Sequence, residues 1–399
     1  MIAGRHGAAL LALVVLLSSL EGFVVAEGPL VISRLRLSVN VTIVNESNGT
    51  ASLEPLLYFN IGMNNSRQRV LVKEVSCRLS YGLDEDGNPV AKLEPDTYQL
   101  GSGESFSFSY VLEIDVYNFS IPDINASEAG SISDVPTEIA EKYAKPCGPW
   151  KYNESGWEWI KNIAYDLKGN DTNVLVILYK FIKWVKDHFT YPTKLVEYPQ
   201  YPNETEVDPN TGKWVGDCDD QANFLITMCR IVGIPAFLQI GFLYVDRNWD
   251  SGWIYNGTSR FTLEDVGWHG WAMVYVPPWG WLPVDLTVWR SFLGEPADHI
   301  ITAAINSAFT VAVMNVTKSD YIAAMKETTA FLYENGLKWV ESQKLEKVYV
   351  YSSEYPEIPV VEVVAAAVVV VAVIASWILV KRRERRMYSG VAIKVVEGE

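Results

Sequence analysis

Residues 216–222 read Gly-Asp-Cys-Asp-Asp-Gln-Ala, and they contain the cysteine on which the interpretation of this chain depends. Apolar residues recur at the spacing of one buried helical face, at Ala222, Leu225, Ile226 and Cys229. The pattern predicts a helix with Cys218 in its first turn, where unpaired N–H groups and the helix dipole favour a reactive thiolate. Cys229, three turns further on, is expected to be a small core residue.

Three acidic residues adjoin this cysteine in the sequence. Asp217, Asp219 and Asp220 oppose a thiolate because each places a second negative charge near it. Aspartate is also common at the start of a helix, so the cluster has a structural explanation as well. We therefore expect activation of Cys218 to depend on an ion pair with a histidine.

Three histidines lie outside the N-terminal apolar segment, namely His188, His269 and His299. His188 ends an amphipathic helix predicted over 174–188, where it would interact with the last carbonyl groups. His299 lies in a loop rich in Gly, Pro and Asp and has no evident partner. His269 is therefore the best candidate for acid–base chemistry.

His269 and Asp285 lie in two consecutive predicted strands, and the pairing of these strands decides whether the two side chains share a face. If Tyr275 pairs with Trp281 across a five-residue loop, Asp285 lies diagonal to His269. If Val276 pairs with Trp281 instead, Asp285 points away.

A working triad requires the first pairing, or a bulge that restores the same parity. We predict that Asp285 lies within hydrogen-bonding distance of one His269 nitrogen. We also predict that the Cys218 sulfur lies roughly 3–4 Å from the other nitrogen.

Four elements occur in the order expected of a known family. They are Gly-Asp-Cys at 216–218, Arg-Ile-Val-Gly-Ile-Pro-Ala at 230–236, His-Gly-Trp at 269–271 and Gly-Trp-Leu-Pro-Val-Asp at 280–285. Over roughly residues 170–290 the chain resembles the transglutaminase-like branch of the papain-like cysteine peptidases. Phe237 departs from the pattern, because an Arg often follows the Pro-Ala pair, but the triad positions are unaffected.

The resemblance implies a papain-like α+β fold and acyl transfer at amides: peptide hydrolysis, deamidation or cross-linking of glutamine to amines. It implies Cys218 as nucleophile, His269 as general base and acid, and Asp285 as the residue that orients the imidazole. Neither a cofactor nor a metal is implied. A calcium-loop reading of residues 246–252 fails, because the loop lacks the required Gly and closing Glu.

Three further residues are weaker candidates for the substrate cleft. The indole of Trp214 or the amide of Gln221 is expected to assist the Cys218 backbone N–H in an oxyanion hole, and the sequence does not decide between them. Trp271, like other tryptophans near the site, is expected to line the cleft or its core.

The chain upstream of this region has the period-2 pattern of strands. Apolar and polar residues alternate over 35–43 and 106–116, which predicts an antiparallel β-sandwich-like domain at 27–134. A transglutaminase-like domain is predicted at 135–345, with a short stalk at 346–359.

Both ends of the chain are apolar. Residues 1–26 are interpreted as a secretory signal peptide, with an uncleaved signal anchor as the alternative. Residues 360–380 are long enough to cross a bilayer, and a buried core helix is the alternative. The basic cluster that follows predicts a cytoplasmic tail at 381–399 and an outer location for the rest.

The predicted outer part has the features of a surface glycoprotein. Eleven Asn-x-Ser/Thr sequons all lie between the two apolar ends. In an oxidising compartment Cys77 and Cys147 are the natural disulfide partners, although sequence alone does not establish connectivity. The formal net charge of −15 makes nucleic acid an unlikely partner.

Two functional hypotheses follow. The first is a membrane-anchored extracellular enzyme that transfers acyl groups on proteins or peptides of the cell envelope. The second is a non-catalytic cell-surface binding or scaffold protein with the same fold, which the acidic residues beside Cys218 favour.

Overall fold

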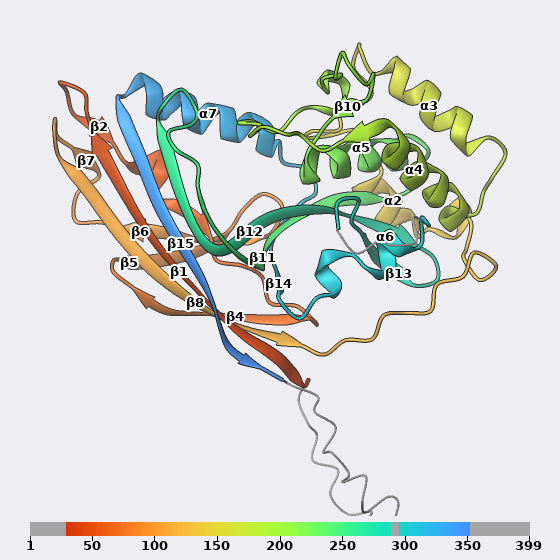
Figure 1. Cartoon of the computed structure of the whole chain (residues 1–399), viewed down its shortest axis with the longest axis horizontal. Helices are drawn as coiled ribbons and strands as arrows, with labels where there is room; N and C mark the ends of the chain where they lie inside the picture. Colours follow the sequence, from red (N-terminus) through yellow and green to blue (C-terminus); the bar gives the residue numbers. More distant parts are fainter. Residues whose placement is uncertain (1–28, 289–294, 352–399) are drawn as a thin grey trace, which may run out of the picture. The chain divides into compact units, whose positions relative to one another are not determined.

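The computed structural model describes residues 29–288 and 295–351 (Figure 1). One eight-stranded sheet has the order β14-β11-β12-β15-β1-β8-β4, with β13 paired to β12 beside this path. Its strands are β1 (Val31–Asn45), β4 (Gln68–Val75), β8 (Ser105–Tyr117), β11 (Ala236–Asp250), β12 (Ser259–Val276), β13 (Gly280–Val284), β14 (Thr310–Val316) and β15 (Leu337–Val350). Within it, only β12 and β15 are parallel neighbours.

The first and last described strands lie side by side in this sheet. β15 pairs with β1 from Asn45 opposite Leu337 to Ser33 opposite Val350. The sheet therefore continues across the predicted boundary between residues 134 and 135. Residues 346–350, which we expected to begin a stalk, are the end of β15 instead, because they pair with β1.

The predicted period-2 pattern of β1 is confirmed. Its apolar residues from Leu35 to Ile43 are buried, and the polar residues between them are at least partly exposed. The buried face packs against a second layer that contains Leu57, Leu79 and Leu93. This layer comprises the three-stranded sheet β3 (Tyr58–Asn60), β6 (Pro89–Glu94) and β5 (Arg78–Leu83), the pair β2 (Ala51–Ser52) and β7 (Gln99–Leu100), and the turn η1 (Glu54–Leu56).

All the helices except the last pack around the other half of the sheet, and the last packs against β15 and the core of the β-rich half. The helices are α2 (Thr137–Tyr143), α3 (Glu158–Lys168), α4 (Val174–His188), α5 (Cys218–Ile231), α6 (Asp298–Ile301) and α7 (Tyr321–Glu334). Shorter elements are the 3₁₀ turns η2 (Ile132–Asp134), η3 (Pro202–Glu204) and η4 (Ala304–Asn306) and the parallel pair β9 (Phe189–Thr190) and β10 (Trp214–Val215).

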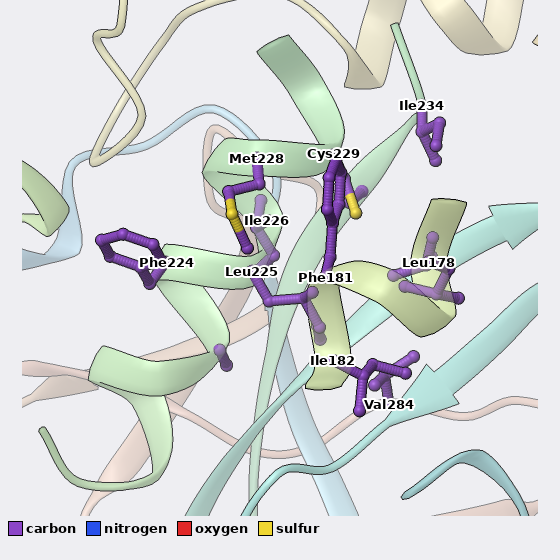
Figure 2. Close-up of a cluster of buried hydrophobic side chains, with 14 of the residues drawn as sticks. Leu178, Phe181, Ile182, Phe224, Leu225, Ile226, Met228, Cys229, Ile234 and Val284 are labelled. Atoms are coloured by element: carbon purple, nitrogen blue, oxygen red, sulfur yellow. The ribbon is translucent and has the colours of Figure 1, made fainter. Parts of the chain in front are cut away.

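The core between α4 and α5 holds the cysteine helix in place. Figure 2 shows Phe181 and Ile182 of α4 beside Leu225 and Cys229 of α5, and all four side chains are fully buried. Burial of each large apolar side chain contributes roughly 1.5–3 kcal/mol. The predicted core role of Cys229 is confirmed.

The ends of α4 also follow the sequence signals. The Asn173 side chain accepts a hydrogen bond from the Val176 N–H and caps the start of the helix. The ring of His188 lies 2.7 Å from the Trp184 carbonyl oxygen. The predicted structural role of His188 at the helix end is confirmed.

The predicted Cys77–Cys147 disulfide is wrong, since all four cysteines are free. Cys77 packs against the core of the β-rich half. The Cys147 sulfur instead lies 3.1 Å from the buried Arg230 guanidinium, in the helical half. The two cysteines therefore belong to different parts of the packing.

The predicted signal peptide (1–26), membrane span (360–380) and cytoplasmic tail (381–399) lie outside the described residues. Within residues 29–288 and 295–351, no helix is both long and apolar enough to cross a bilayer.

Candidate active site

Cys218 is the first residue of α5, as the spacing predicted. Asp217 precedes the helix, and its N–H donates to the Asp220 carboxylate at 3.3 Å. Asp220 is buried and also accepts two hydrogen bonds from Gln200, at 2.7 and 3.1 Å. These contacts hold the loop before Cys218 against the helix.

A glycine lets the start of α5 approach the strand that carries the histidine. A Cβ atom on Gly270 would lie 2.9 Å from the Asp219 Cβ, closer than two such atoms pack. The backbone of Gly270 lies near enough to the Cys218 thiol to lower its pKa. The glycine between His269 and Trp271 therefore brings the thiol to β12.

The strand register is the one that a triad requires. Tyr275 pairs with Trp281, so the predicted five-residue loop is confirmed. The His269 Nε2 atom lies 2.7 Å from Asp285 Oδ2, as predicted, which leaves Nδ1 free. No hydrogen bond joins His269 to Cys218 in the described part of the chain, and the predicted sulfur–nitrogen distance stays a prediction.

The Asp285 carboxylate is buried and fully hydrogen-bonded. It accepts from the Thr287 N–H at 3.0 Å and hydroxyl at 3.2 Å, and from the Ala304 N–H at 3.1 Å. Burial alone would raise the pKa of Asp285, but the His269 charge and hydrogen bond and these N–H donors outweigh it and lower the pKa. Asp285 is therefore held ionised beside the imidazole.

His299 supports Asp285 through the backbone, a role that sequence reasoning missed. Its ring Nδ1 lies 2.9 Å from the Asp285 carbonyl oxygen, and the Asp285 N–H donates to the His299 carbonyl at 3.0 Å. Burial lowers the pKa of His299, which favours the neutral ring. No sequence signal links the two residues, because the loop geometry after β13 alone brings them together.

The Cys218 thiol is not activated in this state. Burial raises its pKa well above the usual value, and the carboxylates of Asp219 and Asp217 raise it further. The backbone of Gly270 offsets only part of this. Cys218 is nevertheless partly exposed and lines the pocket.

Asp219 is tied to the first residue of α7. The Tyr321 hydroxyl donates to Asp219 Oδ2 at 2.6 Å and accepts from the Asn223 amide at 2.8 Å. Asn223 in turn accepts from the Trp150 indole at 3.1 Å. This network links the acidic start of α5 to two other parts of the fold.

Cys218 and His269 line one pocket of about 780 Å³, a size suited to a peptide segment or a small ligand. The pocket extends between α7 and the sheet as far as β15, at Trp339 and Glu341. Its walls include Tyr58, Tyr255, Phe261, Trp268 and Tyr321.

The three weaker cleft candidates do not line this pocket. Trp214 stacks on Trp159 within an aromatic cluster, with 5.6 Å between the ring centroids. Gln221 is buried and donates to the Gly216 carbonyl at 2.8 Å. Trp271 is fully buried and donates to Gln239 at 3.2 Å. Each is thus a packing residue, and Trp268 takes the position at the cleft.

Within the described residues, one group of three side chains has donor atoms close enough to hold a metal. One carboxylate oxygen of Asp217, the sulfur of Cys218 and one carboxylate oxygen of Asp219 all lie within 4.8 Å of one another. Asp219 is already bonded to Tyr321, and the thiol is the candidate nucleophile. The closeness of these three atoms is therefore accounted for by the candidate active site, without a metal.

Comparison with known proteins supports the family resemblance. Residues 161–286 match the model of the transglutaminase-like superfamily, a range that includes Cys218, His269 and Asp285. This match confirms the resemblance that the four sequence elements indicated. A search of the curated proteins found no significant match.

One solved structure shares the fold at low sequence identity, and two others match more weakly. A candidate cysteine protease from Cytophaga hutchinsonii matches with a TM-score of 0.50 and 14% identity, over 80% of this chain and 92% of that chain. Red sea bream transglutaminase matches with a TM-score of 0.27 and 12% identity, over 65% of this chain and 47% of that chain. A candidate protease from Parabacteroides distasonis matches with a TM-score of 0.24 and 8% identity, over 72% of this chain and 68% of that chain. Only the first supports the fold, and none establishes an activity.

Proposed function

We propose that this chain, which carries a transglutaminase-like domain at residues 161–286, is a thiol-dependent acyl-transfer enzyme. The observation that carries the proposal is the His269–Asp285 hydrogen bond at a pocket that also exposes Cys218. A buried, ionised carboxylate that holds one imidazole nitrogen leaves the other free to accept a proton.

In the proposed reaction, His269 Nδ1 takes the proton of the Cys218 thiol as the sulfur bonds to an amide carbonyl carbon. The imidazolium returns the proton to the amine, and the C–N bond breaks to leave a thioester on Cys218. Water or a second amine then attacks the thioester and passes a proton through His269 to the departing sulfur. Asp285 stabilises the imidazolium in both steps.

Profiling of envelope proteins by mass spectrometry tests this activity. Cells with the wild-type chain are compared with cells that carry Cys218→Ala. We expect cut, deamidated or cross-linked amides only with wild type. Cys77→Ser, which removes a free thiol outside the pocket, is the matched control. Identical profiles for wild type and Cys218→Ala would reject the proposal.

The substrates are proposed to be proteins or peptides of the cell envelope, because residues 1–26 and 360–380 have the pattern of a signal peptide and a membrane anchor. Protease added to intact cells should then remove residues 27–359 and spare the tail 381–399. Protection of the large part and loss of the tail would contradict this orientation.

A non-catalytic binding protein is the second candidate, and the electrostatics of Cys218 favour it. Burial raises the pKa of this thiol, and two carboxylates raise it further. Such a protein would retain ligand binding and lose nothing on Cys218→Ala. Turnover that disappears in Cys218→Ala would eliminate this candidate.

A further inference from the structure

The far end of the Cys218 pocket contains a carboxylate in apolar surroundings. Glu341 lies on β15, between Phe261 of β12 and Val41 of β1 in the sheet register, and Val41 in turn pairs with Phe108. An apolar side chain would complete this row of the sheet. A carboxylate there costs free energy because it loses water, so packing alone does not account for it.

The hydrogen bonds of Glu341 come from neutral groups. The Trp339 indole donates to one oxygen at 2.8 Å, and the Gln343 amide donates to the other at 2.6 Å. Gln343 is itself held by the Trp268 indole at 2.8 Å. These contacts fix the carboxylate in position at the pocket wall, and they supply no positive charge.

The chain provides no cation for this carboxylate. Among the residues that the structure describes, no Lys or Arg lines the pocket and none forms an ion pair with Glu341. The nearest lysines along β15 are used elsewhere: Lys338 bonds the Gly257 carbonyl, and Lys344 pairs with Glu264. Burial raises the pKa of Glu341, as expected for a carboxylate without a cation.

The rest of the pocket is also acidic and poor in positive charge. Glu197, Asp217 and Asp219 also line it, and His269 is its only side chain that can carry positive charge. Aromatic rings of Trp339 and Phe261 lie beside the Glu341 carboxylate and suit the aliphatic stem and charged head of a basic side chain.

From this geometry we infer that Glu341 binds the cationic side chain of a lysine or arginine in a peptide substrate. The inference rests on the proposed function and names a recognition site for it. The bound cation does not react. Phe261, opposite Glu341, lies eight residues before His269 on β12, up to roughly 26 Å away at ~3.3 Å per residue. The recognised side chain thus lies several peptide residues from the amide that Cys218 attacks.

Affinity selection tests this without any chemistry at Cys218. A library of capped, randomised octapeptides is incubated with the full-length Cys218→Ala protein, and the bound peptides are sequenced by mass spectrometry. We expect Lys and Arg at one position to be enriched roughly tenfold over an uncharged residue, the effect of one charge-assisted hydrogen bond. The same selection with Cys218→Ala/Glu341→Gln should lose the enrichment.

Two variants serve as controls. Glu346→Gln removes an exposed carboxylate from the same strand and should leave the enrichment intact. Glu341→Asp keeps the negative charge and should keep part of the enrichment. This variant separates loss of charge from loss of folding. Thermal unfolding of Glu341→Gln should show a loss of no more than about 1–3 kcal/mol, because the new amide NH2 group opposes one of the two donors, Trp339 or Gln343.

Several outcomes would overturn the inference. The selection could recover no peptides, or it could recover peptides without a preference for Lys or Arg. A preference that survives Glu341→Gln would also contradict the inference. Competition by cadaverine as strong as that by the selected peptides would assign the site to a small free amine instead. Turnover by the wild type is measured separately, so failure of selection with intact turnover rejects the recognition site and leaves the proposed activity in place.

Discussion

The Nε2 atom of His269 lies 2.7 Å from Oδ2 of Asp285, although the two residues are on different strands. The contact exists because the β12–β13 register places Asp285 diagonal to His269, one residue beyond the last pair, Ala272 and Val284. A shift of one residue in either strand would turn the carboxylate to the opposite face of the sheet. The contact between His269 and Asp285 therefore depends on the length of the loop between these strands.

Asp285→Asn tests the importance of this contact. The variant keeps the shape of the side chain but removes the charge that stabilises a protonated His269. We expect kcat to fall by roughly 10²–10⁴ with a small change in KM, because the charge acts mainly in the transition state. Asp265→Asn, which removes a carboxylate from β12 outside the pocket, should leave kcat unchanged. Equal kcat values for wild type and Asp285→Asn would exclude a catalytic role.

The reactivity of Cys218 provides a second prediction. Because burial and the Asp219 carboxylate raise the pKa of this thiol, its alkylation by iodoacetamide should be slower at pH 7 than that of a free thiol and should rise with pH. Asp219→Asn removes one of the charges that raise the pKa of Cys218 and should therefore speed its alkylation at neutral pH. Mass spectrometry of the modified peptide measures the rate.

A surface carboxylate is the control for this measurement. Asp208 lies in an exposed turn and is absent from the pocket, so Asp208→Asn should leave the alkylation rate of Cys218 unchanged. If Asp219→Asn slowed alkylation instead, the carboxylate would be orienting the thiol rather than suppressing its ionisation.

Tyr321 provides a third prediction, on stability. Tyr321→Phe leaves the Asp219 carboxylate and the Asn223 amide without their partner in a buried setting. The free energy of unfolding should fall by about 1–3 kcal/mol. Denaturant unfolding measures it. Tyr333→Phe, at an exposed position on the same helix, should have almost no effect, and a loss for Tyr321→Phe as small as this would show that the hydroxyl network is dispensable.

Local sequence patterns were sufficient for the elements that carry the triad. The helical spacing after Cys218 and the capping residue Asn173 predicted α5 and the start of α4, and strand alternation predicted the face shared by His269 and Asp285. These features are local, since they depend on residues a few positions apart.

The contacts that complete the site were not predictable in this way. β15 pairs with β1 across some 300 residues, and it carries Glu341 into the Cys218 pocket. Tyr321, at the start of α7, reaches Asp219, at the start of α5, across 102 positions of the chain. Such tertiary contacts leave no periodic signal in the sequence, since the chain returns from a distant position.

The acidic start of α5 gives a final prediction, on the pH dependence of stability. Burial and the Asp219 carboxylate raise the pKa of Asp217 to about 10, whereas an unfolded aspartate has a pKa of about 3.9. The folded chain therefore binds a proton that the unfolded chain has lost between these values, so the contribution of Asp217 to stability should fall as pH rises from about 4 to about 10. Asp217→Asn cannot ionise and still suits the residue before a helix, so it should become more stable than wild type by up to about 1.4 kcal/mol per pH unit in this window. Glu334→Gln, at an exposed position on α7, should follow the wild-type curve. Thermal unfolding at pH 5, 7 and 9 measures the difference, and parallel curves for Asp217→Asn and wild type would show that Asp217 is ionised in the folded protein.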